Sequence, residues 1–287
     1  MSQTNIFTVP KELLPQVNTR YPFVYLEHGR LEIDDRSVKF INADGEVISI
    51  PCGMINCILL GPGTSITHDA IKILSEYNCN VFWTGENGLK FYSCGISPTA
   101  DSKNMRMQMQ YACDKKKSLE IARKMFTKRF PNDDVSSKTL EQLKGMEGVR
   151  VKNLYALYAD KYKVLWNFRN ANLTSFDDAS ITNKWITMFN QFLYSILCSA
   201  TISLGFSPHI GFVHSGSPLP FIYDMADLYK EQLCIEPAFK LTDVVAFSKE
   251  SAIDEFVKNV NDAKILKQFC NDIKMLFGDF NDGSSGE

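Results

Sequence analysis

The sequence predicts an α+β protein in which an N-terminal antiparallel β-domain is followed by an all-α domain. Up to residue 96, short runs rich in Val, Ile, Tyr and Phe alternate with turn pairs at a spacing of about ten residues, which is typical of a meandering antiparallel sheet. A Gly/Ser/Pro-rich break follows at residues 95–104, and residues 97–103 within it are expected to be a linker. From residue 104 to 278 apolar residues recur at helical spacing.

One helix is expected to interrupt the β-domain (residues 1–96), near residues 67–78, where Thr67 can cap "HDAIKILSEY". The tail at 279–287 contains "NDGSSGE", which has no apolar residue, and it is expected to be disordered. In the helical domain the periodicity indicates helices at about 104–130, 139–165, 182–204 and 224–233, and two or more between 250 and 278.

Composition bounds the class of protein. A chain of 287 residues with 45% hydrophobic content can bury a large core, and its length suggests two domains. No run of about 18 apolar residues is present and the N-terminus lacks a basic start followed by an apolar stretch, so we expect a cytoplasmic protein without membrane contact. The eight cysteines form no CxxC pair and are expected to be free, mostly buried thiols.

Charge is distributed unevenly, although the net charge is only −2. Residues 103–169 contain sixteen Lys and Arg against seven Asp and Glu, whereas residues 224–287 contain seven Lys against thirteen acids. A polyanion such as DNA can bind the basic segment. The alternative is that these charges belong to solvated helix faces.

A carboxylate stands in an apolar helix face within the segment 139–165. The face comprises Leu143, Glu147, Val151, Leu154, Tyr158 and Tyr162. An ionised Glu147 there is costly unless it pairs with a cation, such as Arg150 or a distant Lys, or binds a metal. The flanking Gly145 and Gly148 suggest a close approach of backbone or ligand.

A second cluster of polar residues lies in "HIGFVHSGSPLPFIYDMADL". Asp224 and Asp227 share a face near an expected helix N-terminus, and the Gly/Ser/Pro turn lets His214 face them. Carboxylates with one imidazole suit Mg²⁺ or Mn²⁺ better than zinc. Each residue also has an ordinary structural explanation: His214 as a core histidine, and the two aspartates as cap and first-turn acids.

Four motifs, "GPGTSITHDAIKIL", "RKMFTKRF", "LKGMEGVRVKNLYALYADKYKVLWN" and "IGFVHSGSPLPFIYDMADLYK", lie between residues 23 and 278. In these motifs the chain resembles the CRISPR-associated integrase, the core enzyme of spacer acquisition, in its subtype I-E form. The resemblance implies a catalytic helical domain and an N-terminal domain that makes dimer and partner contacts. It also implies a homodimer, and two such dimers assembled around a dimer of a small companion protein.

The resemblance places the metal ligands on Glu147, His214 and Asp227, with Asp224 as a further acid of the site. It implies a transesterification in which the 3′-hydroxyls of a short prespacer duplex attack phosphodiesters at the borders of a CRISPR repeat beside the leader, assisted by Mg²⁺ or Mn²⁺. A host DNA-bending factor is an expected further partner. The basic segment then becomes a DNA-binding surface, with these candidates: Arg123, Lys124, Lys128, Arg129 and Arg150.

Three positions depart from the pattern expected of this subtype: Ser217, Asn170 and Ala171. In relatives these positions help to recognise a motif on incoming DNA, so their change leaves selective capture by this protein in question. Two other functions compete with the integrase. One is a metal-dependent nuclease that hydrolyses branched or single-stranded DNA, and the other is a catalytically silent DNA-binding scaffold.

Overall fold

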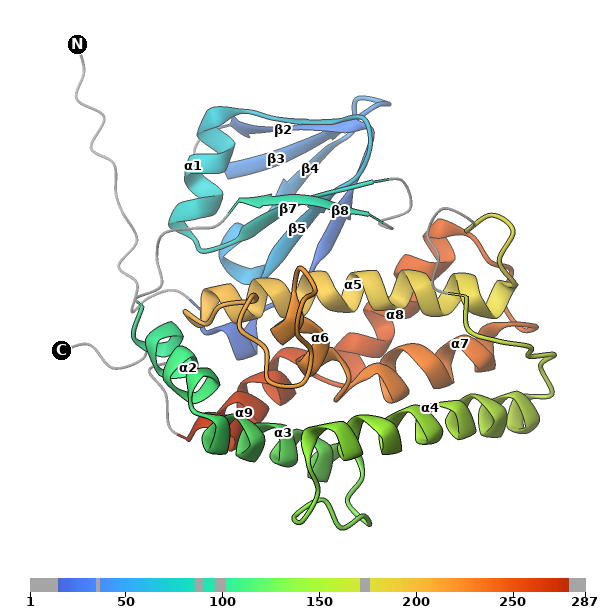
Figure 1. Cartoon of the computed structure of the whole chain (residues 1–287). Helices are drawn as coiled ribbons and strands as arrows, with labels where there is room; N and C mark the ends of the chain where they lie inside the picture. Colours follow the sequence, from blue (N-terminus) through green and yellow to red (C-terminus); the bar gives the residue numbers. More distant parts are fainter. Residues whose placement is uncertain (1–14, 35–36, 86–89, 96–101, 171–175, 279–287) are drawn as a thin grey trace.

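A computed structural model describes residues 15–34, 37–85, 90–95, 102–170 and 176–278. The expected tail at 279–287, and all of the expected linker except residues 102 and 103, lie outside the described residues. The β part and the helical part follow one another along the chain, which confirms the α+β class (Figure 1).

The N-terminal part contains two four-stranded sheets. The first has the order β1 (Val24–Leu26), β5 (Cys57–Leu60), β7 (Asn80–Thr84), β8 (Phe91–Gly95). The second has the order β4 (Val47–Ile50), β3 (Ser37–Asn42), β2 (Gly29–Asp34), β6 (Thr64–Ile66).

Strand direction differs in part from the antiparallel sheet expected. The meander β2–β3–β4 and the pair β7–β8 are antiparallel, whereas β1–β5, β5–β7 and β2–β6 are parallel. The reason is a crossover: after β1 the chain builds the meander of the other sheet before it returns as β5. Such a long connection allows parallel pairing, which a two-residue hairpin cannot provide.

Helix α1 (His68–Glu76) occupies the position expected for the interrupting helix. The Thr67 hydroxyl caps it by accepting from the Ala70 N–H at 3.3 Å. Ala70 and Leu74 are buried, and α1 packs on the sheet that contains β2. The small core between them includes Leu31 and Phe40.

The described helical part begins with α2 (Lys103–Cys113), α3 (Lys115–Arg129), α4 (Leu140–Tyr162) and α5 (Ile181–Ser203). It continues with α6 (Pro220–Ala226), a π-helix (Glu231–Ile235), α7 (Glu236–Leu241), α8 (Lys249–Asp262) and α9 (Ile265–Phe277). Short 3₁₀ turns occur at Val17–Thr19 and Cys52–Met54.

Two helix predictions were wrong in their limits. The single helix expected at 104–130 is two helices, because Asp114 leaves the helical conformation and its carboxylate caps α3 by accepting from the Lys116 N–H at 2.9 Å. The helix expected at 224–233 instead begins at Pro220, whose missing N–H suits a first helical position. Asp224 therefore lies inside α6 and Asp227 caps its C-terminus, so neither acid is at a helix N-terminus.

Helix α5 joins the two parts of the molecule. It lies between the sheets and α4 (Figure 1) and is buried along most of its length. Phe192 stacks on Phe23 with ring centroids 5.5 Å apart, and Asn80 Nδ2 donates to Ser199 Oγ at 2.9 Å. One hydrophobic core thus runs from the first sheet into the helices, which fixes the position of the helical part.

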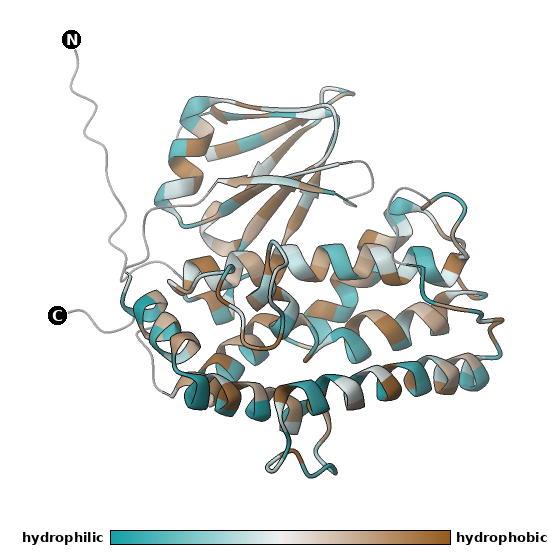
Figure 2. Ribbon diagram, viewed as in Figure 1, coloured by the Kyte–Doolittle hydropathy of each residue, from teal (hydrophilic) through white to brown (hydrophobic). Residues whose placement is uncertain are grey.

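Helix α4 lies at the edge of the helical part, and hydrophilic and hydrophobic residues alternate along it (Figure 2). Within the described residues, no helix is both long and apolar enough to cross a membrane. All eight cysteines are free and six of them are buried, as expected.

Candidate functional site

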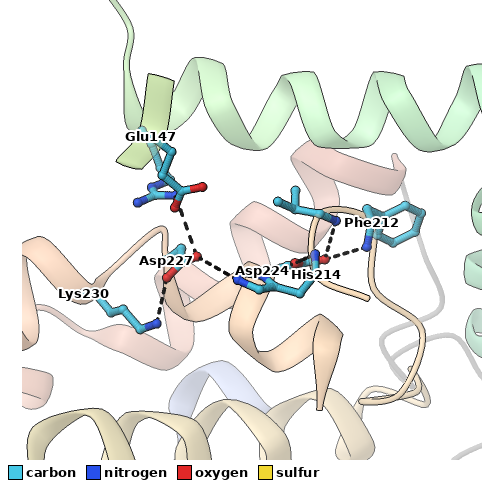
Figure 3. A network of polar contacts seen from close by, with 8 residues as sticks. Glu147, Phe212, His214, Asp224, Asp227 and Lys230 are labelled. Carbon is cyan, nitrogen blue, oxygen red and sulfur yellow. Dashed lines mark hydrogen bonds and ion pairs between the residues drawn. The ribbon is translucent and has the colours of Figure 1, made fainter. Parts of the chain in front are cut away.

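A cavity of about 1240 Å³ opens beside α4, α5 and the chain from His214 to Glu236. Its lining includes three of the four residues expected in the catalytic site: Glu147, His214 and Asp227. Figure 3 shows these side chains converging from α4 on one side and from α6 and the preceding loop on the other.

The fourth residue, Asp224, has a fully buried side chain behind His214. Its Oδ2 accepts from the backbone N–H groups of Phe212 at 2.6 Å and Val213 at 3.1 Å. Its Oδ1 accepts from His214 twice, from the backbone N–H at 2.8 Å and from Nδ1 at 2.7 Å. Four donors use both oxygens, so Asp224 orients the loop and the imidazole and does not face the cavity.

Gly211 permits this close approach. A Cβ at this position would lie 2.8 Å from the backbone oxygen of His214 and 3.0 Å from Asp224 Oδ2. Sequence reasoning did not single out this glycine, although it lies three residues before His214 in "GFVH". Gly145 and Gly148 are the opposite case, because a Cβ at either would meet nothing within 4 Å. The expected close approach of backbone at these glycines is therefore wrong, and the close approach of a ligand stays a prediction.

His214 presents its other ring nitrogen to Asp227. Since Asp224 Oδ1 can only accept, Nδ1 carries a proton and Nε2 of the neutral ring holds a lone pair. Nε2 lies 3.8 Å from Asp227 Oδ2. The hydrogen bond to Asp224 raises the pKa of His214, and the charge of Asp227 adds to this effect.

Asp227 is surrounded by cations. Lys230 Nζ lies 2.8 Å from Oδ1, and Arg129 Nη1 lies 3.8 Å from Oδ2. Burial by itself would raise the pKa of Asp227, but the charges of Lys230 and Arg129 lower it below its ordinary value. Asp227 is therefore ionised, and its Oδ2 is the oxygen turned toward His214 and Arg129.

Glu147 lies on the inward face of α4, as its spacing predicted, but that face lines the cavity around it. Its carboxylate forms an ion pair with Arg129 Nη1. The alternative partner considered from sequence, Arg150, instead pairs with Asp133 and stacks over the ring of Phe130. The cation that compensates Glu147 thus comes from α3 rather than from its own helix.

The donor set of Glu147, His214 and Asp227 fits a hard divalent cation in chemistry. His214 Nε2 has a free lone pair, and one oxygen of Asp227 is not taken by Lys230. In the described residues, however, no group of three or more His, Cys, Asp and Glu is arranged so that it could hold a metal. The guanidinium of Arg129 lies between Glu147 and Asp227, where it pairs with the first and approaches the second.

Known proteins resemble this chain over most of its length. CRISPR-associated endonuclease Cas1 2 of Chlorobaculum tepidum is 48% identical over 95% of this chain and 93% of its own. CRISPR-associated endonuclease Cas1 of Escherichia coli is 34% identical over 78% of this chain and 73% of its own. The family model "CRISPR associated protein Cas1" matches residues 23–134. This chain belongs to the Cas1 family.

Solved structures of the family share the fold. The crystal structure of a TtCas1–DNA complex has a TM-score of 0.66 and 30% identity, and the match covers 90% of this chain and 97% of that one. A CAS1 protein from Thermotoga maritima matches with a TM-score of 0.70 at 16% identity, over 90% of this chain and 97% of its own. The second likeness shows the Cas1 fold alone.

The basic residues of this Cas1-family chain that were expected to bind DNA make contacts within the protein. Arg123 donates to the Lys138 backbone oxygen, Lys124 donates to the Leu276 oxygen at 2.9 Å, and Lys128 pairs with Asp272. The alternative of a solvated helix face does not hold for Arg129, whose side chain is 14% exposed, whereas Lys124 and Lys128 are exposed in addition to making these contacts. Whether they also contact DNA stays a prediction.

Two of the three positions that depart from the subtype pattern lie within the described residues. Ser217 has a buried hydroxyl without a hydrogen-bond partner in the described structure, and the Asn170 N–H donates to Asn183 at 2.9 Å. Ala171 lies outside the described residues. Two contacts of the site were missed from sequence: that of Lys230 with Asp227 and that of Arg129 with Glu147. The pairing of Lys230 could have been read from its three-residue step after Asp227, whereas nothing local places Arg129 beside Glu147.

Proposed function

We propose that this Cas1-family chain is a divalent-metal-dependent DNA integrase, which inserts short DNA segments into a CRISPR repeat array by 3′-hydroxyl attack on phosphodiesters. The observation that carries the proposal is the convergence of Glu147, His214 and Asp227 on one cavity, with His214 fixed by a buried carboxylate. DNA as the substrate is supported by the related TtCas1–DNA complex. Strand joining, as opposed to cleavage, is supported by the sequence motifs.

When bound, Mg²⁺ or Mn²⁺ would lower the pKa of the attacking hydroxyl and stabilise negative charge at phosphorus. Glu147, His214 and Asp227 would hold the ion. Asp224 keeps the proton on His214 Nδ1 and thereby leaves the lone pair of Nε2 available to coordinate a metal. Lys230 holds one oxygen of Asp227 and fixes the direction of the other.

The same proposal includes the partners that the motifs imply: prespacer and repeat DNA, a second copy of the chain, a small companion protein in a four-plus-two complex, and a host DNA-bending factor. The subtype I-E assignment rests on the quoted motifs. The DNA would follow the basic surface of α3 and α4 on either side of the cavity.

Strand joining into a supercoiled plasmid that carries a CRISPR repeat, with Mn²⁺ present, tests the proposal. Wild-type protein should join a prespacer duplex with free 3′-hydroxyls and should not join one with 3′-dideoxy ends. Glu147→Gln conserves side-chain volume and should reduce joining by at least about 100-fold through loss of a metal ligand. Glu141→Gln removes an exposed carboxylate from the same helix and should leave joining unchanged.

The alternatives give different results in the same assay. A nuclease would cut branched DNA with Mn²⁺ whether or not the 3′ ends carry hydroxyls, and would join nothing. A silent scaffold would bind the duplex and neither cut nor join it. Joining by Glu147→Gln at the wild-type rate would show that the ligand assignment is wrong.

A further inference from the structure

Arg129 occupies the central position among the groups that the proposed function assigns to the metal. Its Nη1 forms an ion pair with Glu147 and lies 3.8 Å from Asp227 Oδ2. All three side chains are largely buried, with exposed fractions of 14% for Arg129, 18% for Glu147 and 11% for Asp227. One guanidinium therefore stands between two acids that come from different helices.

The charges in this cluster are already balanced. The carboxylates of Glu147 and Asp227 face the cations Arg129 and Lys230, so a divalent ion entering beside them would bring two uncompensated positive charges. Like charges at a distance of a few ångströms repel strongly when they are shielded from water. Of the two cations, Lys230 pairs with Asp227 Oδ1. Arg129 pairs with Glu147 and approaches Asp227 Oδ2, the oxygen that also faces His214 and that a metal would need.

The surroundings of Arg129 include an aromatic ring and the cavity. Arg129 is the last residue of α3, and its guanidinium lies over the ring of Phe130, with Cζ 5.0 Å from the ring centroid. Its side chain lines the cavity. Rotation of the side chain would leave the charge at the cavity wall, where phosphate is a bidentate partner for a guanidinium.

We propose that Arg129 is the resident counter-ion of Glu147 and Asp227 in the metal-free protein, that a divalent cation displaces its guanidinium, and that the displaced guanidinium binds a phosphate of the DNA. This inference rests on the proposed metal site. It makes metal binding and DNA binding interdependent through one side chain, since the metal frees a cation that DNA can use.

Calorimetric titration of the full chain with Mn²⁺ alone, without DNA, tests the displacement. Arg129→Gln removes the competitor, so Mn²⁺ should bind about tenfold more tightly, equivalent to about 1.4 kcal/mol. Arg129→Lys keeps the charge and should give an intermediate affinity. Arg150→Gln is the matched control: it removes a guanidinium over the same Phe130 ring that contacts neither Glu147 nor Asp227, and it should change Mn²⁺ affinity less than about twofold.

Fluorescence anisotropy with a DNA duplex that ends in 3′-dideoxy nucleotides tests the release. In EDTA, Arg129→Gln and wild type should bind this duplex equally, because the guanidinium is held by Glu147. With Mn²⁺, wild type should bind the duplex more tightly than Arg129→Gln does. Its plot of log affinity against log salt should then be steeper than that of the variant by about 0.9, the slope of one phosphate contact.

The two arms separate failure of this inference from failure of the proposed function. If Glu147→Gln binds Mn²⁺ as wild type does, or if wild type binds none, the ligand set is wrong and the inference falls with it. If Glu147→Gln loses Mn²⁺ while Arg129→Gln binds it no more tightly than wild type, the metal site stands and the displacement is refuted. A DNA-affinity loss in Arg129→Gln that is equal with and without Mn²⁺ would refute the release.

Discussion

His214 and Asp224 form a pair in which one buried carboxylate fixes both the backbone and the ring of the histidine. Asp224 Oδ1 lies 2.8 Å from the His214 backbone nitrogen and 2.7 Å from Nδ1. Because both contacts use the same oxygen, the loop and the imidazole cannot move independently without losing a hydrogen bond to an ionised acceptor. The pair thus couples the shape of the loop to the orientation of the group proposed to bind metal.

Asp224→Asn should destabilise the protein. An amide at this position would turn its NH₂ toward backbone donors, and the buried N–H groups of Phe212 and Val213 would lose a charged acceptor. We expect the free energy of unfolding in urea to fall by about 2–4 kcal/mol. Asp254→Asn, at an exposed position on α8, should change it by less than about 0.5 kcal/mol. Equal stability of the two variants would contradict the buried role of Asp224.

Stability should depend on pH through His214. Its pKa is raised in the folded state, so the charged ring stabilises the fold below the ordinary value of about 6.5. This contribution should decline as pH rises through the folded pKa. The measurement is the difference in unfolding free energy between wild type and His214→Gln, taken in EDTA across this range. The same comparison in the Asp224→Asn background should be much flatter, and a gap that grows with pH would reverse the assigned sign.

His214→Ala distinguishes a metal ligand from a general base. If His214 is a metal ligand, its loss should weaken Mn²⁺ affinity and strand joining together, and added Mn²⁺ should restore part of the activity. If His214 is a general base, its loss should slow joining by about 10²- to 10⁴-fold at saturating metal, with metal affinity nearly unchanged. Calorimetric Mn²⁺ titration and single-turnover joining on the same preparation decide between them. DNA affinity should persist in both cases, because phosphate contacts come mainly from Lys and Arg.

Lys124→Ala should lower stability although the residue lies on a basic surface. Its Nζ donates to the backbone oxygens of Met275 at 3.3 Å and Leu276 at 2.9 Å, at the C-terminus of α9, where the helix dipole favours a cation. We expect a loss of about 1 kcal/mol in thermal or urea unfolding. Lys116→Ala, in the exposed first turn of α3, should cost nothing measurable. If both variants unfold alike, the Lys124 contact does not contribute.

The sequence by itself determined the features that depend on neighbouring residues. The step of three and four residues from Leu143 through Glu147 to Tyr158 identified the inward face of α4, and the capping hydroxyl of Thr67 marks a helix start that the structure has. Periodicity and caps act within one or two turns, so they can be read without the fold. Glu147, His214 and Asp227 reach one cavity as the motifs implied.

Only the tertiary structure decided which charges meet. Arg129 and Glu147 are 18 residues apart and pair because the end of α3 lies against the beginning of α4. Asp224 turned out to be a buried support for His214 rather than an acid facing the cavity, because Pro220 starts α6 earlier than the periodicity indicated. The parallel pairing of β1 with β5 likewise follows from a crossover between two sheets. A local pattern states that a polar group is buried, but its partner depends on which distant segments the core brings together, and that is a property of the packed chain.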